Sequence, residues 1–106
     1  IVRDIKMNTI LRQDLMSSRD RFFMLLERVP RSAALWYKES NSVNIEAFEQ
    51  ALGGMSQGEV QMAKFFAALW FNTNDRYGFD VVDAVAHVDV EDRKLIAEWI
   101  SAPFWP

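Results

Sequence analysis

Apolar and polar positions follow helical spacing along most of the chain, and the clearest stretch runs from about 57 to 71. A Ser-x-x-Glu pattern precedes it, with Ser56 and Glu59 in the positions of a capping box at a helix start. One narrow stripe of polar or small side chains recurs at i, i+4, i+7 and i+11: Gln57, Gln61, Lys64 and Ala68. Nearly every other position is apolar. This pattern predicts a helix in the middle of the core rather than at its edge.

Shorter helices are predicted on both sides of the central one. Residues 5–15 roughly keep helical spacing, and Ser17 followed by Asp20 indicates a new helix after a break near residues 16–18. Pro30 ends that second helix, and segment 31–38 fits a further short helix that carries Leu35 and Trp36 inward. A polar run from 39 to 44 predicts a loop. Three later helices have predicted N-caps: Asn44, Asp80 and Asp89.

No stretch of the chain shows the alternation that is typical of a strand. In the short helix after Asn44, Ala47, Phe48, Ala51 and Leu52 are expected to face inward. In the last helix, the inward residues are expected to be Leu95, Ile96, Trp99 and Ile100. The sequence therefore predicts an all-α fold, a compact bundle of about five or six short helices around the central apolar helix.

The chain of 106 residues is expected to form a single helical domain, 1–106. Half of its residues are apolar and 13% are aromatic, which favours a folded globule over a disordered segment. The chain begins at Ile1 rather than at a methionine, so Met7 is a candidate natural start. Residues 1–6 would then be upstream or added sequence.

Composition excludes several kinds of chemistry. There is no cysteine, which excludes disulfides, thiolate catalysis and cysteine zinc sites. Asp83 and the only histidine, His87, share a helix face, but two ligands fall short of a metal site. The polar loop before Asp80 fails as a calcium loop, because Gly78 at position 6 places Ala84 at position 12, where a glutamate is required. We expect no enzyme activity, no metal and no cofactor.

No apolar run is long enough to span a bilayer, and no signal-peptide pattern is present. These observations predict a cytoplasmic protein without a membrane partner.

Charge is distributed unevenly along the chain. Residues 1–38 carry eight Lys or Arg against four Asp or Glu, whereas residues 39–106 carry four against eleven. The opposite signs either attract each other within the fold or between subunits, or they leave a basic N-terminal surface for an acidic partner. The basic residues that would form that surface are Arg3, Lys6, Arg12, Arg19, Arg21, Arg28 and Arg31.

Four tryptophans are the other prominent feature. Trp36, Trp70 and Trp99 are expected in the core, because each indole buries a large apolar area. Trp105 lies in the proline-bracketed tail Pro103-Phe104-Trp105-Pro106, where it is a candidate anchor for a partner. We expect Phe104 to pack inward and Trp105 to be partly exposed. The candidate partner-binding residues are Trp105, Phe104, Arg12, Arg19 and Arg21.

The second half of the chain resembles a group of small uncharacterised bacterial proteins that are often borne on plasmids, phages or integrated elements. The resemblance covers roughly residues 52–106 and is carried by Met55-Ser56-x-Gly58-Glu59, Phe65, Leu69-Trp70, Phe79-Asp80, Trp99 and the terminal Pro-Phe-Trp-Pro. The group has no established activity, so the resemblance supplies no functional residues. It implies a bacterial cytoplasmic context and an accessory role on mobile DNA.

Together these observations predict a small protein–protein interaction module that regulates or inhibits a host factor, or that forms a homo-oligomer. The alternative is a nucleic-acid-associated accessory protein that uses the basic N-terminal third.

Overall fold

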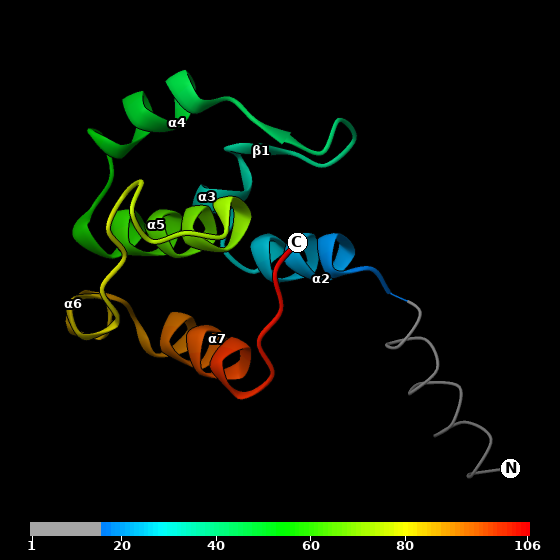
Figure 1. Cartoon of the computed structure of the whole chain (residues 1–106). Coiled ribbons are helices and arrows are strands. Elements are labelled where there is room, and N and C mark those ends of the chain that lie inside the picture. Colours follow the sequence, from blue (N-terminus) through cyan, green and yellow to red (C-terminus); the bar gives the residue numbers. More distant parts are fainter. Residues whose placement is uncertain (1–15) are drawn as a thin grey trace, which may run out of the picture.

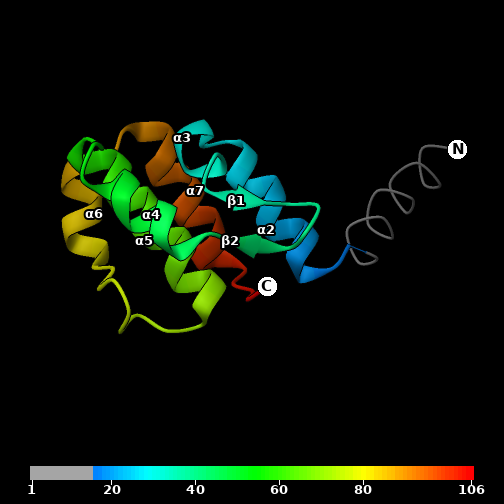
Figure 2. The same ribbon diagram turned by 90° about the horizontal axis from the view of Figure 1, so that it is seen from above.

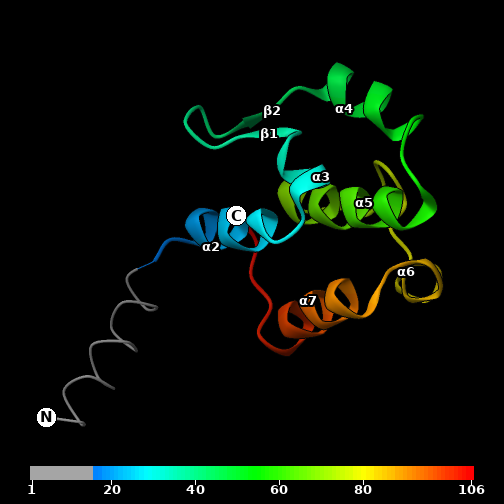
Figure 3. The same ribbon diagram turned by 180° about the vertical axis from the view of Figure 1, so that it is seen from behind.

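The computed structural model describes residues 16–106, which form six helices and one short β-hairpin. In chain order these elements are α2 (Ser18–Glu27), α3 (Pro30–Ala33), β1 (Trp36–Tyr37), β2 (Ser42–Val43), α4 (Ile45–Leu52), α5 (Gln57–Phe71), α6 (Val81–His87) and α7 (Val90–Ser101). Helices α5, α3 and α2 form a middle layer (Figure 1). The hairpin and α4 cover one side of it, and α6 and α7 cover the other, as the view from behind also shows (Figure 3).

Helix α5 is the central element, and its predicted bounds are confirmed. Both hydrogen bonds of the capping box are present: Glu59 N donates to Ser56 Oγ at 3.2 Å, and Ser56 N donates to Glu59 Oε1 at 2.9 Å. The helix ends at Phe71, and its C-cap Asn72 has a φ of 54°, in the left-handed region that asparagine tolerates. Six of its side chains are buried: Met62, Ala63, Phe65, Phe66, Ala67 and Leu69.

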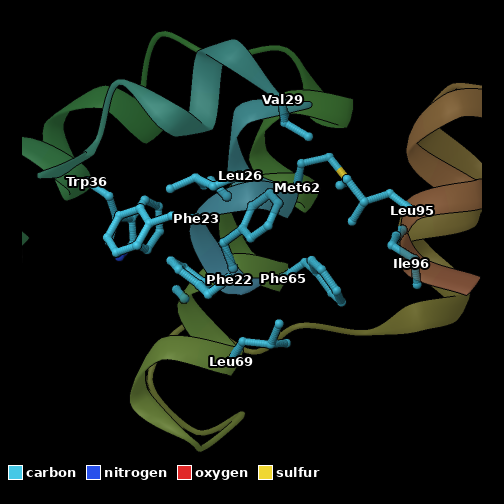
Figure 4. Close-up of a cluster of buried hydrophobic side chains, with 14 of the residues drawn as sticks. Phe22, Phe23, Leu26, Val29, Trp36, Met62, Phe65, Leu69, Leu95 and Ile96 are labelled. Atoms are coloured by element: carbon cyan, nitrogen blue, oxygen red, sulfur yellow. The ribbon is translucent and has the colours of Figure 1, made fainter. Parts of the chain in front are cut away.

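The core forms where α2, α5 and α7 meet, as Figure 4 shows. Phe22 and Leu26 of α2 and Phe65 of α5 are almost completely buried, and Leu95 reaches the same cluster from α7. Phe22 contacts Phe66 edge-to-face, with ring centroids 5.7 Å apart. Such edge-to-face contacts stabilise aromatic pairs beyond the area that they bury.

Helix α2 begins as predicted, because Ser17 Oγ accepts a hydrogen bond from Asp20 N at 3.0 Å. Pro30 follows the end of α2 and is also the first residue of α3. Proline suits this first position, since it has no N–H to satisfy there and its fixed φ matches a helix. The short helix predicted within segment 31–38 therefore starts one residue earlier and ends at Ala33.

The prediction that the chain contains no strand is wrong. Trp36 pairs with Val43 and Tyr37 with Ser42 in an antiparallel hairpin, so part of the predicted loop is strand β2. The turn closes with Asn41 at φ 49° and with a hydrogen bond from Asn41 N to Lys38 O. Trp36 is only 5% exposed, and its burial holds the hairpin against the core. The sequence pattern does not predict the strands, because two residues are too few to show an alternation of apolar and polar positions.

The predicted caps Asn44, Asp80 and Asp89 are confirmed, since each side chain accepts a backbone hydrogen bond from the first turn of its helix. Two predicted inward positions are wrong. Ala47 is exposed, because α4 lies on top of the molecule (Figure 2) and reaches the core chiefly through Phe48. Ile100 is 55% exposed, because α7 is an outer helix whose buried face consists of Leu95 and Ile96.

The predicted helix within residues 5–15 and the expectation about Met7 lie outside the described residues. Within residues 16–106, no helix combines the length and the apolar character that crossing a bilayer requires.

Candidate functional site

The C-terminal tail, residues 103–106, leaves the end of α7 and crosses toward α2 (Figure 1). The indole N–H of Trp99 donates a hydrogen bond of 2.8 Å to the backbone oxygen of Phe104. The Phe104 side chain is 9% exposed, whereas Trp105 is 50% exposed. Trp105 packs edge-to-face with Trp99, with ring centroids 5.5 Å apart. The tail therefore docks on its own chain, with Phe104 inward and Trp105 half in solvent.

Arg21 of α2 joins this tail. Its guanidinium carbon lies 4.3 Å from the centroid of the Phe104 ring, which is a cation–π contact. Arg19 stacks instead on Trp70, at 4.6 Å. Two residues apart on a helix point about 200° apart, so α2 separates these two arginines. The structure thus brings Arg21 and Phe104 into contact, places Trp105 against Trp99 and Arg19 against Trp70, and does not describe Arg12.

A groove of about 370 Å³ lies between α2, α7 and the tail. Its less exposed walls are Leu25, Trp99 and Phe104, and its exposed lining includes Arg21, Met24 and Glu98. Trp99 also lines a second hollow of about 220 Å³, together with Phe65, Phe79 and Trp105. The tail consequently runs between two hollows. We call the side chains at this place, Arg21, Met24, Trp99, Phe104 and Trp105, the tail surface.

Sequence reasoning did not identify Met24 or Trp99 as part of a site. Met24 shares the face of Arg21 three residues away, and it is 53% exposed, so an apolar residue on the outer face of α2 was the available signal. The size of its indole predicts only a core position for Trp99. It serves both purposes, because its ring packs on Phe65 while its N–H holds the tail.

The basic residues between 16 and 38 are already in contact with other groups. Ion pairs join Arg28 to Glu98, Arg31 to Glu59 at 3.5 Å and Lys38 to Glu27 at 3.9 Å. With the two ring contacts of Arg19 and Arg21, these account for every Lys and Arg between residues 16 and 38. Two of these ion pairs, Arg28 with Glu98 and Arg31 with Glu59, join the basic part of the chain (1–38) to the acidic part (39–106) within one molecule.

Two carboxyl groups at helix starts have shifted pKa values. Hydrogen bonds from the Ser56 backbone and then from its hydroxyl lower the pKa of Glu59, with a smaller contribution from Arg31. Burial, followed by repulsion from Asp89, raises the pKa of Asp92. Neither residue lines the groove. Within the described part of the chain, no three His, Asp or Glu side chains are grouped to hold a metal ion.

The tail surface combines a half-exposed tryptophan with an arginine, and both residue types are enriched at protein interfaces. Comparisons of the chain with protein-family models, with curated proteins and with solved structures find no match.

Proposed function

We propose that this chain is a small non-enzymatic protein-binding module, and that its partner docks on the tail surface. The observation that carries the proposal is Trp105, which is half exposed and lines the hollow of about 220 Å³. The residue before it, Phe104, lines the groove together with Arg21 and Met24. Tryptophan and arginine are the residues that contribute most often to binding energy at interfaces. Methionine adapts its shape to a partner.

Docking of the tail prepares Trp105 for binding. The contact with Trp99 and the neighbouring prolines restrict the indole before a partner arrives, so less conformational entropy remains to be lost. Covering the exposed half of an indole removes about 100 Å² from water, worth about 2–3 kcal/mol. This contribution is typical of a residue at the centre of an interface.

The proposed role is that of an accessory regulator or inhibitor in the bacterial cytoplasm, encoded on a mobile element. The partner is another protein or a second copy of the chain. This role draws on the resemblance of residues 52–106, while the binding surface draws on the geometry of the tail.

The test compares two variants of the full chain. Trp105→Ala removes the proposed anchor, and Val82→Ala removes a 73% exposed valine on α6, outside the tail surface. Each protein is immobilised and exposed to a bacterial lysate, and captured proteins are quantified by mass spectrometry. The specific partner is then titrated in purified form by calorimetry.

We expect Trp105→Ala to weaken binding at least tenfold, about 1.4 kcal/mol, and Val82→Ala to change it less than twofold. Equal retention of the partner by both variants would exclude the tail surface as the binding site.

Nucleic-acid binding through the basic N-terminal third is the alternative. It draws on Arg3, Lys6 and Arg12 and on the five cations between residues 16 and 38. These five already contact carboxylates or aromatic rings, which leaves less positive potential for phosphates, and we rank this alternative second. Gel-shift assays at several salt concentrations separate the two. DNA affinity that falls steeply with salt would favour the alternative.

A further inference from the structure

The outward side of α6 is apolar. Val82 is 73% exposed, and Val81 and Val85 are 44% and 43% exposed. Ala86 is exposed as well. These four residues stand at i, i+1, i+4 and i+5 of the helix, so they share an arc of about 140° of its surface. We call them the α6 face.

The opposite side of α6 already supplies its contact with the fold. Ala84 is fully buried, and Val88 at the C-cap is 5% exposed; both belong to the hydrophobic core. The helix itself lies at an outer edge of the molecule (Figure 1 and Figure 3). A surface helix normally buries one apolar stripe and turns polar side chains to water. Helix α6 carries a second apolar stripe, and a grouped exposed patch of this kind marks an interaction surface.

The shape of the α6 face favours a polypeptide as its occupant. Small ligands bind in concave sites. The groove and the hollow at the tail surface, and a third hollow of about 360 Å³ between α5 and α6, are lined by other residues. A helix uses its backbone N–H and C=O groups within itself, so α6 has no free edge for an added strand. Contact with the α6 face is therefore made through side chains, as when one helix packs on another.

The charge around the α6 face selects the sign of that partner. Between residues 77 and 92 the chain has no Lys or Arg and five acidic residues: Asp80, Asp83, Asp89, Glu91 and Asp92. Asp80 directly precedes the face, Asp83 lies within α6, and Asp89 follows the helix. The next basic residue, Arg93, donates a hydrogen bond of 3.0 Å to the backbone oxygen of Val88. A partner with Lys or Arg beside its apolar residues matches this rim.

We propose that the α6 face binds an amphipathic helix of another protein, one whose apolar stripe is flanked by Lys or Arg. The stripe covers the valines, and the flanking cations lie beside Asp80, Asp83 and Asp89. A second copy of the chain fits less well, because two α6 faces in contact would bring these carboxylates together. Anionic membranes and nucleic acids carry the same sign as the rim. This site is separate from the tail surface and goes beyond the proposed function.

The test uses an amphipathic helical peptide of Leu and Lys, about 14 residues long, titrated into the ¹⁵N-labelled full chain and followed by NMR. Three matched peptides replace Lys by Glu, replace Leu by Ser, or contain the same residues in an order without an apolar face. We expect the Leu and Lys peptide to bind about tenfold more tightly than each of them, with shifts concentrated in residues 80–91. Equal binding of the reordered peptide, or shifts centred on the tail surface, would overturn the proposal.

Matched variants locate the contact. The double variant Val82→Ser and Val85→Ser is expected to weaken peptide binding about tenfold, whereas Ile100→Ser, at a 55% exposed position on α7, changes it less than about twofold. Asp83→Asn is expected to weaken binding about threefold, and Glu46→Gln, at an exposed carboxylate on α4, to leave it unchanged. Equal effects within either pair would overturn the site. Asp83→Asn keeps the test informative if the double variant does not fold.

Two further measurements separate the other occupants. Trp105→Ala is expected to bind the peptide as the wild-type protein does, just as Val82→Ala is expected to retain the partner of the tail surface. Loss of the peptide by Trp105→Ala would contradict two separate sites. Sedimentation of the wild-type protein and flotation with phosphatidylglycerol vesicles complete the test. A dimer, or vesicle binding, that the double serine variant abolishes would assign the α6 face to a second copy or to a membrane and overturn the proposal.

Discussion

Gly58 has no side chain at the point where the first turn of α5 meets the end of α6. The nearest atom to an added Cβ is the backbone oxygen of His87, which cannot rotate away as a flexible side chain would. The need for glycine here therefore comes from packing between two helices that are distant in the sequence. Nothing in the neighbouring residues reveals it, whereas the capping role of Ser56 and Glu59 is local and was predicted from their spacing.

We expect Gly58→Ala to lower the free energy of unfolding by about 1–3 kcal/mol, the usual range for overpacking. Gly53→Ala is the matched control, because its added Cβ would meet only an ordinary contact, Gln50 O at 3.5 Å, at a φ of −65°. The control should be neutral or slightly stabilising, by about 0.4–1 kcal/mol, since alanine reduces the entropy of the unfolded chain. Urea denaturation measures both, and equal stability of the two variants would contradict the close approach.

Among the elements, the start of α5 links helix capping to the pH dependence of stability. Folding lowers the pKa of Glu59, so its charged form is favoured in the native state. The contribution of Glu59 is therefore present above its unfolded pKa and is lost as the pH falls through its folded pKa. Asp92 contributes to the pH dependence of stability in the opposite direction, because folding raises its pKa. Its contribution to the stability of the native protein becomes more favourable as the pH falls.

We expect the free energy of unfolding of Glu59→Gln to fall less steeply than that of the wild-type protein as the pH is lowered from about 5 to about 3. Glutamine keeps the return hydrogen bond of the capping box but does not titrate. For Asp92→Asn, the free energy of unfolding should fall more steeply over the same pH range. Unfolding free energies of the wild-type protein and the two variants, measured across this pH range, check the prediction. Parallel curves for all three proteins would refute it.

Element prediction succeeded where the signal is local. Side chains that cap helices act within three residues, so Ser17, Asn44, Asp80 and Asp89 placed their helices correctly. The hairpin failed because Trp36 is held by rings from other elements, with Phe48 at 5.6 Å and Phe22 at 5.7 Å. Periodicity gives the apolar face of a helix but not the neighbour that covers it. Ile100 was misplaced for this reason.

At the scale of the whole molecule, the tail closes the fold and also forms its candidate site. The sequence alone indicated the tail aromatics and Arg21. It did not indicate the groove, because that groove requires α2 and α7 to lie side by side, and the ion pair between Arg28 and Glu98 that joins them spans 70 residues. Contacts over such a distance leave no local pattern in the sequence.

We expect Phe104→Ala to cost about 3 kcal/mol of stability, since it removes a buried ring and the cation–π contact with Arg21. Trp105→Ala should cost less than about 1 kcal/mol, because half of its side chain is already in water. Chemical denaturation of both variants makes the comparison. Comparable losses would show that Trp105 is part of the core and would remove the basis for its role as an anchor.

The indoles of this protein lie close together in two pairs. Trp36 and Trp70 have ring centroids 6.4 Å apart at an interplanar angle of 68°, and Trp99 and Trp105 lie 5.5 Å apart at 86°. Two indole rings at such short distances, with their planes steeply inclined to each other, couple their electronic excitations. Circular dichroism of the protein will therefore contain exciton couplets superimposed on the helical signal, and helix content read from that spectrum alone will be in error. The couplet of Trp99 and Trp105 disappears when the tail leaves α7, which makes it an intrinsic optical reporter of tail docking.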